Sequence, residues 1–187
     1  MKNLYIVRHC EALGQESDAP LTDEGLKQAN ALAAFFKDLR VEKIISSPYK
    51  RAVQTVEPLA KEMGIGIEVE DALKERILSV EAFSDWKDRL KMTFGDFDLK
   101  FKGGESSNEA KKRILGIIKK VINNEFENTI IVTHGNLMSL LLQHYNNSFG
   151  FEQSISLSNP DVYHIKITDN KVMQERIWNS DCINEIR

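Results

Sequence analysis

Residues 4–11 read LYIVRHCE, an apolar run that ends abruptly in a cation, an imidazole, a thiol and a carboxylate. The run is short, contains Tyr, Ile and Val, and is bounded by polar residues, which is typical of a strand buried on both faces. In open α/β sheets, ligands bind beyond the carboxyl ends of the strands. The stretch therefore predicts a central strand and a candidate site at its end, where Arg8 and His9 stand.

Two later stretches repeat this pattern of an apolar strand followed by a helix start. KIISSPYKRAVQT at 43–55 predicts a strand at 43–46, then Ser47 as a helix cap and Pro48 at the first helical position. TIIVTHGN at 129–136 predicts another buried strand that ends in His134, and an apolar helix follows it. Asn136 is expected to cap that helix.

The rest of the chain alternates between helical and strand patterns. Helices are predicted from Thr22 to about residue 39, with Leu26 on the apolar face, from 48 to about 64, and from Ser106 to about 123 with a capping box to Glu109. Possible strands lie at 65–70, 162–167 and 171–178, the last two joined by a turn at 168–170. We expect an α/β three-layer sandwich with a mostly parallel central sheet, helices on both faces and an antiparallel edge.

Residues 71–104 form a mixed, charged stretch that predicts a helix around 80–93, closed by Gly103 and Gly104. We expect a single domain over residues 1–187, in which a cap or insert at about 76–104 covers the site.

Composition narrows the classes of protein and of partner. The 187 residues carry a net charge of −3, with 42% hydrophobic and 28% charged residues, so no broad basic surface argues for nucleic acid. Cys10 and Cys182 form neither a disulfide framework nor a metal-type spacing, and we expect reduced thiols. The apolar runs are too short for a signal peptide or a membrane span. We therefore expect a cytoplasmic protein without a membrane partner.

The polar residues at the strand ends predict an anion site. Arg8, His9 and His134 follow two strands, and Arg51 lies in the first turn of the helix after a third. The two helix starts add backbone amides and positive dipole ends, which we expect to be free for a ligand. Such a pocket favours a dianion, and phosphate fits best because arginine binds its oxygens bidentately.

Six short motifs together carry a resemblance to a known family. They are Arg8-His9-Cys10-Glu11, PLTDEGLKQA at 20–29, SSPYKRAVQT at 46–55, LKE at 73–75, GGES at 103–106 and THGN at 133–136. In this order, and over most of the chain, the sequence resembles the histidine phosphatase superfamily, also called the phosphoglycerate mutase-like family.

The resemblance implies roles for five residues. His9 would be the nucleophile that forms a phosphohistidine. Arg8, Arg51 and His134 would hold the phosphoryl group and its developing charge. Glu75 would be the general acid for the leaving oxygen and then the base for water. Phosphoryl transfer needs positioning and charge stabilisation above all, so no metal or other cofactor is expected.

Three departures from the family pattern leave alternatives. The family often places a glycine and tryptophan pattern after its catalytic glutamate, but ILSVEAFSDW at 77–86 lacks the glycine, so Glu81 is the alternative to Glu75. Gln15 stands where many members carry a phosphate-binding asparagine, and it is either a phosphate ligand or a loop residue. Cys10 replaces the usual glycine. Because Glu16, not an arginine, follows Cys10 six residues later, we expect a packing role for the thiol.

These observations predict a metal-independent phosphomonoesterase that acts on a small phosphorylated metabolite. A phosphoglycerate-type mutase is the nearest alternative. Mutases of this family are longer and favour Ser-Asp-Leu over Ser47-Pro48-Tyr49, which favours hydrolysis here. A phospho-ligand binding protein without catalysis is the third possibility. No oligomeric state is predicted.

Overall fold

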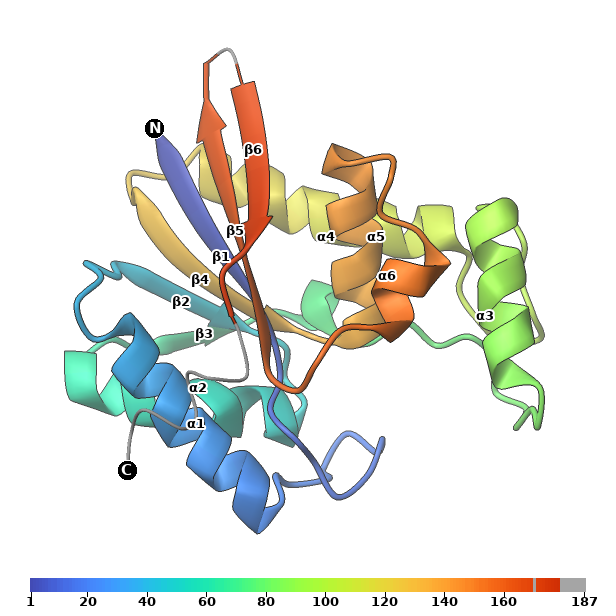
Figure 1. Cartoon of the computed structure of the whole chain (residues 1–187), viewed down its shortest axis with the longest axis horizontal. Helices are drawn as coiled ribbons and strands as arrows, with labels where there is room; N and C mark the ends of the chain where they lie inside the picture. Colours follow the sequence, from blue (N-terminus) through green and yellow to red (C-terminus); the bar gives the residue numbers. More distant parts are fainter. Residues whose placement is uncertain (170, 179–187) are drawn as a thin grey trace.

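A six-stranded sheet forms the centre of the computed structural model, which describes residues 1–169 and 171–178. The strands are β1 (Lys2–Arg8), β2 (Lys43–Ser46), β3 (Ile67–Val69), β4 (Asn128–Thr133), β5 (Asp161–Thr168) and β6 (Lys171–Arg176). Their order is β3-β2-β4-β1-β5-β6 (Figure 1). The first four in this order pair in parallel, whereas β5 pairs antiparallel with both β1 and β6. The mostly parallel sheet with an antiparallel edge is confirmed.

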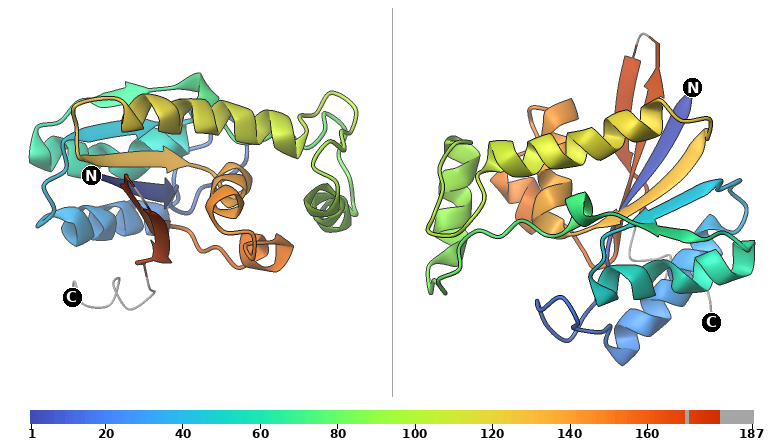
Figure 2. Two further views of the ribbon diagram at one scale, coloured as in Figure 1. Left: turned by 90° about the horizontal axis from the view of Figure 1, so that it is seen from above. Right: turned by 180° about the vertical axis from the view of Figure 1, so that it is seen from behind.

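Helices cover both faces of the sheet. They are α1 (Asp23–Phe36), α2 (Lys50–Met63), α3 (Trp86–Gly95), α4 (Ser107–Ile122), α5 (Gly135–Tyr145) and α6 (Phe151–Ile155), with a 3₁₀ turn η1 (Asp71–Leu73) after β3. The pair α1 and α2 lies on the opposite side of the strands from α4 and α5 (Figure 1). Helix α3 stands apart from the sheet, beside α6 (Figure 2). The single-domain organisation with a cap at 76–104 stays a prediction.

Strand β1 is buried on both faces, as its apolar run predicts. Leu4 and Ile6 pack in the core formed with α4 and α5, while Tyr5 and Val7 pack in the core formed with α1 and α2. Strand alternation sends successive side chains to opposite faces, so one unbroken apolar run supplies both cores. β1 therefore holds the two layers of helices together.

Helix α2 begins later than the sequence predicts. Its first residue is Lys50 and its N-cap is Tyr49, without a side-chain cap. Ser47 is not the cap, because its hydroxyl accepts from the Tyr49 amide at 3.3 Å and lies 2.8 Å from His134 Nε2. The chain thus makes a turn between β2 and the helix. The helix ends at Gly64 as predicted, with the left-handed φ of 66° that favours glycine.

Two further helices differ from their predicted extents. Helix α1 starts at its Thr22 cap but ends at Phe36, and Leu26 is exposed rather than buried. The buried face of α1 is centred on Ala29, Leu32 and Phe36, and Leu26 lies at its edge in the first turn. Helix α3 starts at Trp86 rather than near 80.

The remaining local predictions agree with the structure where it describes them. The capping box between Ser106 and Glu109 is present at the start of α4. β5 and β6 form the predicted hairpin, although Asn170 in its turn lies outside the described residues, as does Cys182. Within residues 1–169 and 171–178, none of the helices has the length and apolar character needed to cross a membrane.

Replacing Ile130 with alanine should test the two-sided core. Ile130 is fully buried in β4, so Ile130→Ala is expected to lower the free energy of unfolding by about 3 kcal/mol in urea denaturation. Leu26→Ala is the matched control and should change it by less than about 0.5 kcal/mol, because Leu26 is 45% exposed. Equal losses in the two variants would contradict this description of the core.

Candidate active site

The pairing of β1 with β4 brings the two predicted histidines together. Arg8 is paired with Thr133 in the parallel register, so the next residue of each strand lies side by side with its neighbour. The His9 amide donates to the Thr133 carbonyl at 3.1 Å, and the imidazole rings of His9 and His134 are 5.1 Å apart between centroids. Residues that are 125 positions apart in the sequence thus meet at the carboxyl ends of two neighbouring strands.

His9 is held in one tautomer by its main-chain contact. Its Nδ1 lies 2.7 Å from the Cys10 carbonyl, which can only accept a hydrogen bond, so Nδ1 carries the proton. Nε2 keeps its lone pair and accepts a hydrogen bond from Arg51 Nε at 3.2 Å. Burial above all lowers the pKa of His9 to about 3; the Cys10 contact opposes this, and the charges of Arg51 and Arg8 add to it. The ring is therefore neutral near pH 7.

Arg51 joins the loop after β1 to the start of α2. It is 1% exposed, and its Nη1 donates to the carbonyls of Gln15, at 3.1 Å, and Glu16, at 2.7 Å. Its guanidinium lies 4.9 Å from the centre of the Tyr49 ring. The contact that ties Gln15 to this site is made by its carbonyl oxygen, and its side chain is exposed. Whether Gln15 binds phosphate stays a prediction.

Arg8 approaches the same place from the other side of β1. Its Nη1 donates to the Leu157 carbonyl at 2.6 Å, and its Nε has no hydrogen-bond partner among the described residues. Burial lowers the pKa of Arg8, while the charges of Glu75 and Asp161 oppose this. A Cβ at Gly135 would lie 3.1 Å from Arg8 Cζ, so the glycine leaves room for the guanidinium.

His134 is fully buried between the strand ends. Its Nε2 lies 2.8 Å from Ser47 Oγ, and its Nδ1 has no partner among the described residues. Burial first, and then the charges of His9 and Arg51, hold the pKa of His134 well below its usual value. The Tyr49 ring lies 5.0 Å from the His134 ring, edge to face. A second neutral imidazole therefore faces His9.

Glu75 binds the N-terminus of α5, whose amides are expected from the sequence to be free for a ligand. Its carboxylate accepts hydrogen bonds from the amides of Asn136 and Leu137, both at 3.1 Å, and from the Arg76 amide at 2.8 Å. The α5 amides are thus bound by a side chain from a distant segment, and Asn136 is not the cap of α5. The N-cap position belongs to His134, and Asn136 is already inside the helix.

Arg8, His9, Arg51 and His134 are called here the cluster. The structure brings Glu75, rather than Glu81, to this cluster. Burial lowers the pKa of both Arg8 and Arg51, and in each case the nearby charge of Glu75 opposes this. Glu81 is exposed and pairs with Lys102 at 2.7 Å within the 76–104 segment. Its position offers no contact with the amides of α5 that hold Glu75.

Two arginines that the sequence reads only as charged residues fix the segment around Glu75. Arg76 is 5% exposed and donates to the Glu105 carbonyl at 2.9 Å and to the hydroxyls of Thr93 and Ser107, each at 3.0 Å. Arg113 donates to the carbonyl of Ala72 at 2.6 Å and to both carboxylate oxygens of Glu105, at 2.8 and 2.9 Å. No sequence motif marks Arg76, and the helical position of Arg113 favours a solvated face.

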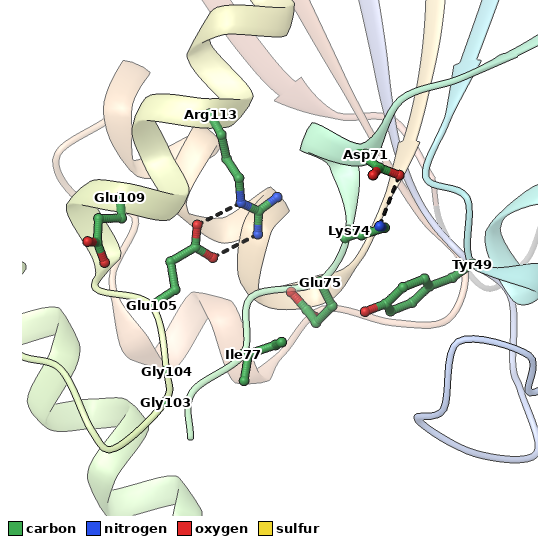
Figure 3. Close-up of a pocket in the computed structure, with 10 residues that line it drawn as sticks. All are labelled: Tyr49, Asp71, Lys74, Glu75, Ile77, Gly103, Gly104, Glu105, Glu109 and Arg113. Atoms are coloured by element: carbon green, nitrogen blue, oxygen red, sulfur yellow. Dashed lines mark hydrogen bonds and ion pairs between the residues drawn. The ribbon is translucent and has the colours of Figure 1, made fainter. Parts of the chain in front are cut away.

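A cavity of about 540 Å³ lies beside Glu75 (Figure 3). It is lined by Tyr49, Asp71, Lys74, Glu75, Ile77, Gly103, Gly104, Glu105, Glu109 and Arg113. The Tyr49 hydroxyl points toward Glu75, and the Glu105–Arg113 pair forms part of the opposite wall (Figure 3). The cavity therefore adjoins the cluster at Tyr49 and Glu75.

Cys10 and the remaining histidines lie outside the chemistry of the cluster. Cys10 is fully buried and packs against Leu21 and Ala29, and burial raises the pKa of its thiol to about 12. His164 stacks on Tyr5 with ring centroids 4.9 Å apart, and His144 lies in the last turn of α5. Among the described residues, no three or more His, Cys, Asp or Glu side chains are grouped so as to hold a metal ion. That no metal is used stays a prediction.

Comparisons with known proteins point to one family. The sequence model of the histidine phosphatase superfamily, branch 1, matches residues 4–180. A relative from Hydrogenobacter thermophilus, provisionally named phosphoserine phosphatase 2, is 28% identical over 159 residues, which cover 76% of this chain and 77% of the relative. GpmB of Shigella dysenteriae, provisionally named a phosphoglycerate mutase, is 28% identical over 160 residues, which cover 76% of this chain and 74% of that protein.

A solved structure supports the fold. A mycobacterial glucosyl-3-phosphoglycerate phosphatase, determined with inorganic phosphate, superposes with a TM-score of 0.79. The match covers 98% of this chain and 99% of that chain at 20% sequence identity. The sheet order and the helix layers therefore agree with a phosphoglycerate mutase-like fold.

The lowered pKa of His9 predicts how stability depends on pH. Unfolded His9 binds a proton below about pH 6.5, but folded His9 does so only near pH 3, so acidification between these values favours unfolding. The stability that comes from keeping His9 neutral is therefore fully present above pH 6.5 and is lost as the pH falls. Over this range the unfolding free energy should decrease by up to about 1.4 kcal/mol per pH unit. His9→Asn should flatten the pH dependence of urea unfolding between pH 6.5 and 4. Parallel curves for the variant and wild type would contradict a neutral buried ring.

Proposed function

Because this chain belongs to the histidine phosphatase superfamily, we propose that it is a metal-independent phosphomonoesterase acting on a small phosphorylated metabolite through a phosphohistidine at His9. One observation supports this most directly. The Nε2 lone pair of a neutral, buried His9 faces the guanidinium of Arg51, and Arg8 directly precedes His9 at the end of β1. A neutral imidazole flanked by cations is suited to attack a dianionic phosphoryl group.

In the first step, His9 Nε2 attacks phosphorus and the bond from phosphorus to the alcohol oxygen breaks. Arg8 and Arg51 stabilise the charge on the equatorial oxygens, with His134 as a further donor. Glu75 supplies a proton to the departing oxygen. In the second step, water attacks the phosphohistidine, the phosphorus–nitrogen bond breaks, and Glu75 takes a proton from that water. Inorganic phosphate and the neutral ring of His9 result.

The position of Glu75 supports its proposed role. Three amides orient its carboxylate at the boundary between the cluster and the cavity. A group at that boundary can reach the oxygen that joins phosphorus to the alcohol. The same amides also make Glu75 a cap of α5, so its removal would have a structural effect as well as a chemical one.

A mutase is the second candidate, and the likeness to GpmB favours it. A mutase would return the phosphoryl group from His9 to a substrate hydroxyl instead of to water. Interconversion of phosphoglycerate isomers without release of phosphate would establish this alternative. A binding protein without turnover would instead yield no phosphoenzyme on quenching in alkaline detergent, in which a phosphohistidine is stable. The cytoplasmic location and the absence of a cofactor stay predictions.

His9→Asn should abolish release of phosphate from p-nitrophenyl phosphate, with a fall in kcat of at least about 10³-fold. The variant should also fail to form the acid-labile phosphoenzyme that rapid quenching traps in the wild type. His144→Asn, which alters a histidine outside the cluster, is the control and should keep wild-type activity. Hydrolysis by His9→Asn at the wild-type rate would overturn the proposed nucleophile.

Glu75→Gln should separate the acid role from the capping role. The amide oxygen of glutamine still accepts hydrogen bonds, but glutamine cannot supply the proton that the leaving oxygen needs. The loss of rate should therefore be larger for a substrate whose leaving alcohol is more basic. We expect kcat/KM for glycerol 3-phosphate to fall at least about tenfold more than kcat/KM for p-nitrophenyl phosphate. Glu81→Gln should change neither value. Equal losses for both substrates in Glu75→Gln would assign Glu75 a structural role alone.

A further inference from the structure

We propose that the alcohol released from the phosphoester is a neutral, hydroxyl-bearing group, and that the cavity beside Glu75 binds it in preference to an alcohol that carries a carboxylate. This inference rests on the proposed hydrolysis and adds the chemical class of the substrate. The ten residues that line the cavity are called here the leaving-group wall. Their position, their charges and the hydroxyl of Tyr49 each support the proposal.

The position of the leaving-group wall follows from two of its members. Glu75 is held against the amides of α5, next to His134. Tyr49 lies with its ring 4.9 Å from the Arg51 guanidinium and 5.0 Å from the His134 ring. A phosphoryl group bound by Arg51 and His9 would therefore have its alcohol next to Tyr49 and Glu75. The cavity is the space that begins there (Figure 3).

The charges of the leaving-group wall disfavour a second anion. Of its ten residues, four carry carboxylates and two carry cations. Lys74 Nζ lies 3.0 Å from an oxygen of Asp71, and Arg113 binds both oxygens of Glu105 (Figure 3). Each cation is thus paired within the wall itself. A carboxylate on the leaving alcohol would therefore find no unpaired cation among these ten residues. Of the two remaining carboxylates, Glu109 binds Lys100 outside the wall and Glu75 is bound by the amides of α5.

The wall offers hydrogen-bonding groups to a neutral alcohol instead. The Tyr49 hydroxyl can donate or accept, and it points into the cavity toward Glu75 (Figure 3). The opposite side is closed by main chain, because the glycine turn packs directly on residue 78: a Cβ at Gly104 would lie 2.1 Å from the Leu78 carbonyl oxygen. Hydroxyl groups of a small polyol fit such a surface, which mixes a phenol, carboxylates and one apolar residue, Ile77.

Glycerol 3-phosphate and 3-phosphoglycerate form a matched test pair, because they differ mainly by a hydroxymethyl group against a carboxylate. In steady-state assays at low ionic strength, kcat/KM should be at least about tenfold higher for glycerol 3-phosphate. Equal kcat/KM values, or a higher value for 3-phosphoglycerate, would overturn the inference. Because both substrates would still be hydrolysed, the proposed function would be unaffected by that result. No hydrolysis of either, or of p-nitrophenyl phosphate, would overturn the proposed function and this inference with it.

Asp71→Asn tests the charge argument within the same pair of substrates. The change removes one carboxylate and leaves Lys74 unpaired. The ratio of kcat/KM for glycerol 3-phosphate to kcat/KM for 3-phosphoglycerate should therefore fall at least about threefold. Glu24→Gln is the matched control: it breaks the Lys27–Glu24 pair, also three residues apart and exposed, on the distant helix α1. This control should keep the wild-type preference. A preference unchanged in Asp71→Asn would overturn the role of the wall charges.

Discussion

The parallel register between β1 and β4 is the constraint on which the rest of the site depends. It places the residues after Arg8 and Thr133 next to each other, so His9 and His134 meet although they are far apart in the chain. The buried guanidinium of Arg51 and the half-buried guanidinium of Arg8 complete the cluster. Burial of cations and imidazoles opposes folding unless other groups stabilise them. The apolar cores on both faces of β1 supply that stabilisation, so the fold and the site share one strand.

A second constraint is the contact between Glu75 and the start of α5. Helix N-termini attract anions through their free amides and their dipole. Here a carboxylate of the same chain takes that place, which fixes Glu75 relative to His134 at the end of β4. The helix terminus thereby orients an ionisable side chain instead of binding a ligand directly. One contact serves both the stability of α5 and the geometry of the cluster.

Local patterns predict the strands and most helix ends, because apolar periodicity and caps depend on neighbours in sequence. The Thr22 cap, the Gly64 terminus and the capping box at Ser106 are examples. Local patterns also place Arg8, His9, Arg51 and His134 at strand and helix ends, whereas Glu75 is singled out only by the resemblance to a family. The roles of Ser47 and Asn136 are missed, because partners from other segments compete for the local cap. Leu26 is missed because packing decides which edge of an amphipathic face is covered. Arg76 and Arg113 are missed for a related reason: nothing in a charged sequence tells a buried hydrogen-bonding arginine from a solvated one.

The contacts of Arg76 and Arg113 give the 76–104 segment fixed ends. Arg113 holds the main chain at Ala72 and the carboxylate of Glu105, and Arg76 binds the Glu105 carbonyl. Between these anchors, the segment projects away from the sheet (Figure 2). Its length and sequence can therefore diverge without displacing Glu75, much as a loop can be exchanged on a rigid scaffold. The two guanidinium groups thus act as a mechanical boundary: a change of shape within the segment ends at them and does not reach the carboxylate on the other side.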